Sequence, residues 1–505
     1  MAEDGIITES SNQETSDLAN DLKKQNKYGM TVLSVTTVGA LLATIQGSAL
    51  MIVLPELMMD LHMEFITLLW VLLVYLMVTT IMVPVLGRLA DMFGRKRMYV
   101  LGFGVFALGS LLCGLATPMD GTPLLHGGWE LVIFRVVQAL GGAMLLANST
   151  AMITDAFLKT KLGFGLGVNQ IAVAAGIVIG PVIGGILAPF GWEWIFFINV
   201  PFGIIGMVWA HIRLREPRWE KVEQRFDAVG AIAFFIGLFG ILTACTYISM
   251  GDPSQMLIAY VMAVIGIIGI AAFILVERRV RYPMMDLRLF RVKRYTMGNM
   301  ANLLNGLCMG AATFLLIFYF QGPLGKDALT AGLLLVPSGI PIMIFGPLSG
   351  KWSDRYGPRL LMAVGLTMTT IALIGLIFID RNTPMWYLVI IMVLMGIGGG
   401  LFISPNASSV MTAVPTERRG TASGTRIMLR NTGTMFSLAI AFPLVLTGLS
   451  QEDMMNIFFG GGSVSSSSLD IFESGLSEAF MIFAAISVIS IIVAVMNYER
   501  KQRPE

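Results

Sequence analysis

The chain has 505 residues, of which 55% are hydrophobic and only 13% are charged, and its mean hydropathy is +0.77. A soluble domain carries about 25% charged residues, so this composition excludes an ordinary soluble protein. The formal net charge of +2 gives no indication of a nucleic-acid partner, and none is expected.

Apolar stretches long enough to cross a lipid bilayer fill most of the sequence. A hydrocarbon core about 30 Å thick needs roughly 20 helical residues to cross it. Such segments must be helical, because lipid offers no partner for backbone N–H and C=O groups. We therefore predict an all-α integral membrane protein with fourteen transmembrane helices. They span 30–53, 67–87, 98–117, 130–151, 165–188, 194–212, 228–249, 257–276, 297–320, 329–350, 360–379, 385–406, 421–447 and 478–497.

Three polar segments lie outside these crossings. Residues 1–27 lack an apolar core, so they are not a signal peptide, and we expect a disordered tail. Residues 450–477 contain a run of glycines and serines, and we expect a flexible loop there. Residues 499–505 form a second short tail.

The basic residues alternate along the chain. If the N-terminus is cytoplasmic, 29 of the 34 Lys and Arg residues fall in segments on that side of the membrane. Cytoplasmic loops of membrane proteins carry such an excess of basic residues. We therefore expect a multi-pass protein of the plasma membrane with both termini in the cytoplasm.

Two loops repeat the pattern G-x-x-x-D-x-x-G followed by a basic residue. The repeated positions are Gly87, Arg88, Asp91, Gly94, Arg95 and Lys96 in the first loop, and Gly350, Asp354, Gly357 and Arg359 in the second. The loops occupy matching places in two six-helix halves, 28–215 and 295–498, if the helices within 226–278 are an extra linking pair. This predicts two bundles related by duplication with a substrate path between them. An ordinary positive-inside turn remains the simpler interpretation of either loop alone.

The fourth predicted helix carries an arginine within the membrane. The helix contains Arg135, Gln138 and Gly141. An intramembrane arginine costs several kcal/mol and usually faces a polar path or a partner. The alternative is that Arg135 lies close enough to the helix end for its side chain to snorkel to the interface.

The fifth predicted helix contains the pattern G-x-x-x-G-P-x-x-G-G. Its residues are Gly176, Gly180, Pro181, Gly184 and Gly185. The first, second and third of these glycines follow at intervals of four, so they form one smooth face that permits close helix contact. The proline removes one backbone hydrogen bond and bends the helix. The pattern fits either a gating helix or a packing seam without a gating role.

The polar groups predicted within the membrane are mostly neutral, and no Asp or Glu lies in the middle of any crossing. The candidate cavity residues are Gln46, Asn148, Asn169, Gln170, Asn299, Asn302, Asn305, Asn406 and Arg430. Buried amides need hydrogen-bond partners, which either a hydrated cavity or a neighbouring helix supplies. Arg426 and Arg430 share one helix face, and such a cavity suits neutral or anionic amphiphiles better than cations.

Acidic residues near helix ends are the remaining candidates for carrying protons, with solvated loop carboxylates as the alternative. They are Glu56, Asp60, Asp155 and Glu193. The three cysteines lie in apolar helices and imply no disulfide or metal site. No phosphate-binding G-x-x-x-x-G-K-[ST] motif occurs. We expect no cofactor, no metal and no enzymatic activity.

These motifs together resemble the major facilitator superfamily, and most closely its fourteen-helix drug/proton antiporter branch. The loop at 87–97 resembles the family's motif A, although Met92 replaces the usual base, and helix 4 resembles motif B. Residues 176–185 match motif C at every fixed position. The resemblance implies the major facilitator fold, a latching role for the motif A loop, a part for Arg135 in proton coupling, and export rather than import.

The sequence also departs from this branch in helix 1. Many members carry an acidic residue in helix 1 where this chain has Gln46. We expect a monomeric secondary transporter in membrane lipid that exports amphiphilic small molecules in exchange for protons. The alternative is a carrier or exchanger for one specific metabolite, lipid or peptide without proton coupling. A transporter-like sensor or scaffold is a third possibility that the gating motifs disfavour.

Overall fold

The computed structural model describes residues 2–63, 65–116, 128–157, 162–216, 227–250, 254–280, 283–415, 419–446, 448–449, 453, 457 and 466–496. Within these ranges every regular element is a helix, which confirms the predicted all-α architecture. Thirteen helices in this part of the chain are long and apolar enough to cross a membrane. They coincide with thirteen of the fourteen predicted crossings.

The N-terminal half of the chain forms six long helices, α1, α3, α4, α5, α6 and α8. Their bounds, with those of the short elements between them, are α1 (Ala2–Ala49), η1 (Leu50–Ile52), α2 (Leu54–Asp60), α3 (Phe65–Phe93), α4 (Arg95–Gly114), α5 (Trp129–Ala156), α6 (Leu162–Leu187), η2 (Ala188–Phe190), α7 (Trp194–Phe197) and α8 (Asn199–Arg213). A linking pair follows, α9 (Ala228–Met250) and α10 (Met256–Arg279).

The C-terminal half forms a second set of long helices after a short 3₁₀ turn. Its elements are η3 (Leu287–Arg291), α11 (Lys293–Gln321), α12 (Ala328–Tyr356), α13 (Pro358–Leu376), α14 (Met385–Thr412), α15 (Arg419–Leu446) and α17 (Ser466–Val495). α15 stands at the remaining predicted crossing, at 421–447, and is not one of the thirteen apolar helices. It carries arginines and several hydroxyl residues within its first half.

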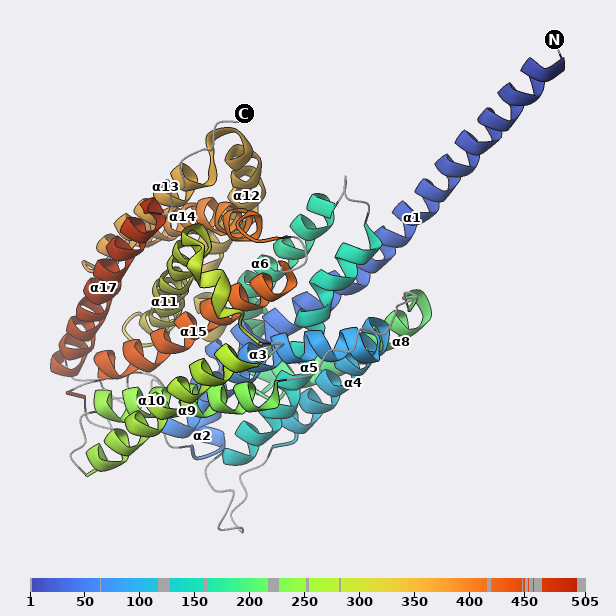
Figure 1. The fold of residues 1–505 in the computed structure, drawn as a ribbon. Coiled ribbons are helices and arrows are strands. Elements are labelled where there is room, and N and C mark those ends of the chain that lie inside the picture. The colour runs from blue at the N-terminus through green and yellow to red at the C-terminus, as the bar shows by residue number, and fades with distance from the viewer. Residues whose placement is uncertain are drawn as a thin grey trace.

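The two halves repeat one packing order. In the first half, α1 packs on α6, α3 on α5, and α4 on both α5 and α8. In the second half, α11 packs on α15, α12 on α14, and α13 on both α14 and α17. Each helix therefore packs against the equivalent helices in both halves, as expected for a duplicated bundle. Figure 1 shows the two groups of helices with the linking pair beside them.

Two helix pairs join the halves. α6 packs along α12, and α3 packs along α15. These seams correspond to each other, because α3 and α12 are second in their halves while α6 and α15 are fifth. α9 lies against both α3 and α15, so the linking pair flanks one of the two seams.

The linking pair itself is held together by glycine-to-glycine packing. A Cβ added at Gly240 would come 2.6 Å from the backbone nitrogen of Gly266, and one at Gly269 would come 2.5 Å from that of Gly237. Small residues let helix backbones approach closely in a membrane. The ring of Phe239 on α9 lies 4.8 Å from that of Trp70, which anchors the pair to α3.

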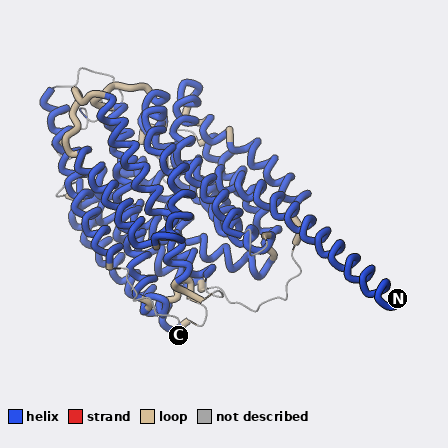
Figure 2. The backbone as a smooth tube through the Cα atoms, turned by 90° about the horizontal axis from the view of Figure 1, so that it is seen from above, coloured by secondary structure: helices blue, strands red, loops and turns tan. Residues whose placement is uncertain are grey.

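The N-terminal helix is longer than the sequence predicted. Residues 2–27, expected to be disordered, continue α1 as helix and project from the body in both Figure 1 and Figure 2. No proline occurs before Pro55. Extending a helix that has already formed costs much less than starting one, so the membrane-crossing part of α1 supports its own extension.

Part of the segment predicted as a flexible loop, 450–477, is also helical, because α17 begins at Ser466. Phe472 and Leu476 are fully buried, and their spacing places them on one helix face. Residues 458–465, which include the glycines of the low-complexity run, lie outside the described residues. The tail predicted at 499–505 lies outside them as well.

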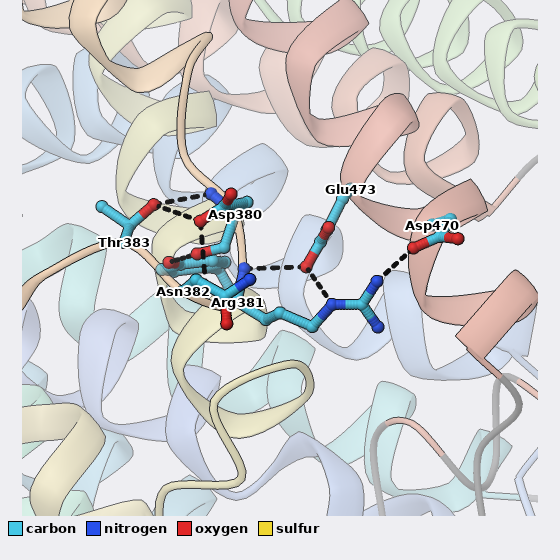
Figure 3. A network of polar contacts seen from close by, with 7 residues as sticks. Asp380, Arg381, Asn382, Thr383, Asp470 and Glu473 are labelled. Atoms are coloured by element: carbon cyan, nitrogen blue, oxygen red, sulfur yellow. Dashed lines mark hydrogen bonds and ion pairs between the residues drawn. The ribbon is translucent and has the colours of Figure 1, made fainter.

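A polar network fixes the start of α17 to the turn between α13 and α14 (Figure 3). The guanidinium of Arg381 pairs with Asp470 and lies 3.8 Å from Oε1 of Glu473. The backbone nitrogen of Arg381 donates to the same Glu473 oxygen at 2.8 Å. Oδ1 of Asp380 accepts from the hydroxyl of Thr383 at 2.9 Å and stabilises the turn.

The repeated loops share a backbone feature. Gly94 precedes α4 with a φ of 105°, and Gly357 precedes α13 with a φ of 82°. Only glycine adopts this region without strain. We call the end of the molecule at these two glycines the basic end, because α3 and α12 end there beside arginines and lysines. We call the end with α2 and α7 the opposite end.

Candidate functional site

Arg135 on α5 forms the centre of a buried polar network in the N-terminal half. Its side chain is only 1% exposed. Nε donates to the carbonyl oxygen of Val71 at 3.2 Å, and Nη1 donates to Oε1 of Gln138 at 2.7 Å. The guanidinium carbon also lies 4.5 Å from the ring centre of Tyr75, a cation–π distance. Arg135 therefore points into the bundle in this structure and does not snorkel to the interface.

Gln46 on α1 contributes to the same network. With its amide oxygen facing the guanidinium, that oxygen accepts a hydrogen bond from Nη1 of Arg135 at 3.2 Å, and its nitrogen donates to the carbonyl of Ile195 at 3.2 Å. Amide orientations are assigned from such partners. The Gln46 amide also lies 2.5 Å from Nδ2 of Asn199 on α8. The residue that departs from the antiporter pattern thus contacts the intramembrane arginine.

The network continues to two more helices. Nε2 of Gln138 donates to the hydroxyl of Ser110 on α4 at 2.8 Å. The hydroxyl of Tyr75 on α3 donates to the carbonyl of Ala43 on α1 at 2.8 Å. In the part of the chain that the structure describes, no carboxylate forms an ion pair with Arg135. Among the described residues, the partners of its charge are neutral groups and the rings of Tyr75 and Phe196.

A second polar cluster lies in the C-terminal half, where α11 meets α14 and α15. Nδ2 of Asn302 donates to the carbonyl of Arg426 at 2.8 Å, and Nδ2 of Asn406 donates to that of Gly298 at 2.8 Å. Asn299 donates back to its own helix at Tyr295. We call Asn299, Asn302, Asn305, Asn406, Arg426 and Arg430 the C-half cluster.

Several buried polar atoms of the C-half cluster have no hydrogen-bond partner among the described residues. They are Oδ1 of Asn299, Nδ2 of Asn305, Oδ1 of Asn406 and Nε of Arg426. Buried polar atoms in native proteins are normally paired with protein or water. The unpartnered atoms of three amides and one guanidinium therefore mark a place where water or a ligand can form hydrogen bonds with the protein.

The glycines of the fifth predicted helix press α6 against two neighbours. A Cβ at Gly184 would come 2.5 Å from the carbonyl oxygen of Ala49, and those at Gly176 and Gly180 would collide with hydroxyls of α1. A Cβ at Gly185 would instead meet the backbone of α12, 2.7 Å from the carbonyl oxygen of Ala328. The predicted close contact is present, and it places α6 between its own half and the other half.

The basic residues of the first repeated loop have different partners. The guanidinium of Arg88 donates to the carbonyl of Pro283, in the segment after the linking pair. Both carboxylate oxygens of Glu277 on α10 accept from the backbone of that segment, at Met284 and Met285. The side chains of Asp91 and Asp354 lie outside the described positions, so their latching role stays a prediction.

Three of the four candidate proton carriers come together at the opposite end. The half-buried carboxyl of Glu56 on α2 lies within the electrostatic reach of Asp60 and Glu193. Burial, reinforced by these two negative charges, raises the pKa of Glu56 above its ordinary value. The fourth candidate, Asp155, lies at the basic end and forms an ion pair with Nη1 of Arg95 at 2.6 Å.

The remaining candidate amides have helix partners or are not described. Asn169 accepts from the hydroxyl of Ser149 at 2.9 Å, which joins α6 to α5. Asn148 donates to the carbonyl of Met144 on its own helix at 2.8 Å. The side chain of Gln170 lies outside the described positions. Helix-to-helix hydrogen bonding therefore accounts for Asn169 and for the nitrogen of Asn406. The side-chain oxygens of Asn148, Asn299 and Asn406 have no partner among the described residues.

Sequence reasoning missed four residues of these sites. Tyr75, Ser110 and Asn199 complete the network around Arg135 and Gln46. Glu277 was not expected to hold a backbone segment. Hydroxyls and rings in apolar helices carry no signal that separates them from ordinary core residues. Among the described residues, no three His, Cys, Asp or Glu side chains are placed to hold a metal ion.

Comparison with known proteins places this architecture among transporters. The family model described as Major Facilitator Superfamily matches residues 36–438 and 298–505. The riboflavin transporter RibZ of Clostridioides difficile is 29% identical over 415 residues, covering 81% of this chain and 86% of RibZ. The multidrug transporter protein MdtP of Bacillus subtilis is 26% identical over 426 residues, covering 83% of this chain and 76% of MdtP.

Solved structures show the same fold. A bacterial homologue of the human lysosomal transporter Spinster, crystallised in an inward-facing and unoccupied conformation, superposes with a TM-score of 0.62. The alignment covers 93% of this chain and 97% of that chain at 14% identity. The helix packing, the repeated loops and the match to the family over most of the length lead to one conclusion. The chain belongs to the Major Facilitator Superfamily of transporters.

Proposed function

We propose that this protein is a secondary active transporter that exports amphiphilic small molecules by alternating access, coupled to a proton gradient. The observation that carries the proposal is the position of α6, whose glycine face lies against α1 while Gly185 lies against α12. α6 contacts both halves, and glycines of α12 receive it on the other side, with Gly332 against the backbone of Pro181 and Gly339 against the side chain of Val178. Such close contact through small residues suits a helix about which the halves tilt. The multidrug transporter among the relatives supports export of varied amphiphiles.

The duplicated seams support the alternating-access mechanism. α6 with α12 and α3 with α15 are equivalent pairs in the two halves. Opening one end of a path between the bundles loosens contacts at that end of both seams. The same motion tightens them at the other end, so the substrate is exposed to one side at a time.

The acids at the opposite end support proton coupling. Glu56 has a raised pKa and lies near Asp60 and Glu193, so it binds and releases protons closer to neutral pH than an isolated carboxyl does. Asp155 in its ion pair with Arg95 is a second candidate at the basic end. Protons entering beside Glu56 would drive the return of the empty carrier.

The placement of charge supports the orientation. We propose that both termini face the cytoplasm, in the plasma membrane, and that the protein acts as a monomer. The basic end bears Arg88, Arg95 and Arg359, whereas the charged residues of α2 at the opposite end, Glu56 and Asp60, are both acidic. A tag on either terminus should be accessible only after permeabilisation of intact cells. A tag accessible at one terminus alone would contradict the orientation and the even number of crossings.

Reconstituted protein tests the proposed activity. Proteoliposomes loaded with a fluorescent amphiphile are given an inwardly or outwardly directed pH gradient, and its movement is followed with time. We expect a gradient of the correct sign to accelerate flux at least tenfold, and nigericin, which collapses the gradient, to abolish the gain. Flux that ignores the gradient would remove proton coupling, and no flux of any amphiphile would remove the exporter function.

A second candidate function is a carrier for one specific metabolite without proton coupling. Two observations favour it: Gln46 stands where many drug/proton antiporters have an acid, and a relative that is a riboflavin transporter aligns over 81% of this chain. Riboflavin exchange across proteoliposome membranes, unchanged by nigericin, would support this candidate. Transport of many unrelated amphiphiles would exclude it.

A further inference from the structure

The C-half cluster concentrates positive charge without a matching acid. Arg426 and Arg430 are four residues apart on α15, so their side chains leave the same helix face. That face packs on α11, because Asn302 bonds the carbonyl of Arg426 and Gly306 packs on the backbone of Arg430. Arg294, near the start of α11, donates to the hydroxyl of Ser409 on α14 at 3.1 Å.

The three helices that carry the cluster supply no counter-charge; α15 also packs on α3, where the side chain of Asp91 lies outside the described positions. The sequences of α11, α14 and α15 contain no Asp or Glu. Between residues 293 and 446 the acids are Asp327, Asp354, Asp380 and Glu417. The first three lie in loops or at helix ends, and Glu417 lies outside the described residues. In the described part of the chain, neither Arg426 nor Arg430 forms an ion pair. Two like charges on one buried face repel each other and favour binding of an anion between them.

The atoms left without partners have the chemistry of an anion site. Arg426 is only 8% exposed, and its Nε has no partner among the described residues. Nδ2 of Asn305 is a second buried donor without an acceptor. Guanidinium and amide donors together bind carboxylate and phosphate oxygens through charge-assisted hydrogen bonds. Oδ1 of Asn299 and of Asn406 would accept from a hydroxyl or amide of the same ligand.

We propose that the C-half cluster binds the anionic group of an amphiphilic ligand, a carboxylate or phosphate, through Arg426 and Arg430. This inference rests on the proposed transport function and narrows its substrate class to anionic amphiphiles. An anionic lipid head group offers the same chemistry as a free anionic substrate. The N-half network around Arg135 differs, because its guanidinium already has protein partners at Nε and Nη1.

Binding measurements test the inference independently of transport. Protein in phosphatidylcholine nanodiscs is titrated against two xanthene dyes of opposite charge, anionic fluorescein and cationic rhodamine 123, and fluorescence anisotropy is recorded. We expect fluorescein to bind at least tenfold more tightly than rhodamine 123. Equal binding, tighter binding of rhodamine 123, or no binding of fluorescein would overturn the inference.

Substitutions locate the site. Arg430→Gln and Arg426→Gln should each weaken fluorescein binding at least tenfold and leave rhodamine 123 binding unchanged or stronger. Arg430→Lys keeps the charge and should retain the preference for the anion, which serves if a Gln variant fails to fold. Arg288→Gln removes an exposed arginine outside the cluster and is the matched control. Unchanged fluorescein binding in Arg430→Gln and Arg426→Gln would place the anion elsewhere and overturn the assignment.

Two further experiments distinguish a lipid ligand from a free amphiphile, and the anion site from the exporter function. Repeating the titration in nanodiscs that contain phosphatidylglycerol identifies a lipid occupant if fluorescein affinity falls, and a free amphiphile if it does not. Proteoliposomes then report flux of both dyes. Anion-selective binding without flux would support this site while contradicting the exporter function. Flux of both dyes without any preference would support the exporter and overturn the anion site.

Discussion

The guanidinium of Arg135 lies 3.2 Å from the side-chain amide of Gln46, which links the fourth and first long helices of the N-terminal bundle. Both residues are buried. An amide in this position satisfies a hydrogen bond but does not neutralise the arginine, so the charge persists within the bundle. This contact joins Gln46, which departs from the antiporter pattern, to Arg135, the most buried charged residue in the part of the chain that the structure describes.

Replacing Gln46 tests that contact. Gln46→Leu removes an acceptor from Arg135 and a donor from the carbonyl of Ile195. Loss of partners for buried polar groups costs about 1–3 kcal/mol, so we expect a lower apparent Tm in a fluorescence-detected unfolding assay. The Gln46→Glu variant should add a proton-dependent component to flux, because a carboxylate beside Arg135 titrates whereas an amide does not.

Thr367→Val provides the control for Gln46→Leu, since Thr367 is an exposed polar residue on α13. An apparent Tm for Gln46→Leu equal to that of the control would show that the contact is not stabilising. Identical pH dependence in Gln46→Glu and wild type would show that this position is uncoupled from protons.

Gly184 tests the close approach of α6 to α1. A methyl group there would lie 2.5 Å from the carbonyl oxygen of Ala49. Overpacking of this kind costs about 1–3 kcal/mol, so Gly184→Ala should lower the apparent Tm and reduce transport. Gly346→Ala on α12 is the matched control, because a Cβ there meets nothing within 4 Å. A helical Gly→Ala change without a clash stabilises by about 0.5–1 kcal/mol, so the two variants should shift Tm in opposite directions.

The repeated loop glycines give a second backbone test. Gly94 and Gly357 have φ values of 105° and 82°, and alanine at either position is strained. We expect each Gly→Ala variant to lower stability by about 1–3 kcal/mol. Gly350→Ala is the control, because its nearest neighbour, Oγ of Ser404, is 3.7 Å from the added Cβ. Similar losses at Gly94 and Gly357 would support structural equivalence of the loops, and a normal Gly94→Ala protein would contradict the strain argument.

Arg381 tests how firmly α17 is attached at its start. Arg381→Gln removes its ion pairs with Asp470 and Glu473 (Figure 3). Partly exposed ion pairs contribute about 0.2–1 kcal/mol, so the apparent Tm should change little. Hydrogen exchange across 466–473 should become faster in the variant, while exchange in α13 stays unchanged. Unaltered exchange in that segment would show that the Arg381 side chain is not needed to hold the start of the helix.

Glu56 predicts a specific pH dependence. Burial and the neighbouring Asp60 and Glu193 raise its pKa above the ordinary value of 4.5. A raised pKa in the folded state favours folding below the unfolded-state value, and that contribution is lost as the pH rises through the folded-state value. Glu56→Gln should therefore match wild type near pH 4 and become the more stable protein as the pH increases, by about 1–2 °C in apparent Tm.

The control for this pH series is Glu478→Gln, which replaces an exposed carboxylate on α17. Its Tm difference from wild type should stay constant with pH. If the apparent Tm of Glu56→Gln followed that of wild type in parallel across the whole pH range, ionisation of Glu56 would carry no free-energy cost in the folded state.

The periodic and compositional features of the sequence were enough to determine the helices. The crossings, the glycine face of α6 and the two repeated loops follow from local chemistry, because a helix in lipid must satisfy its own backbone. The start of α17 at Ser466 was missed, since the Gly/Ser run before it obscured the apolar spacing that includes Phe472 and Leu476. The continuation of α1 through residues 2–27 was missed because polar composition alone does not stop a helix already formed.

Tertiary structure alone decided which polar groups meet. The sequence identified Arg135 and Gln46 separately, but Tyr75, Ser110 and Asn199 complete their network from three other helices. The same holds for Glu56 and Glu193, which are distant in sequence but close enough in space for the charge of one to raise the pKa of the other. Local sequence fixes a helix and its faces, whereas the partner of each face depends on how the helices pack, and that order is a property of the whole chain.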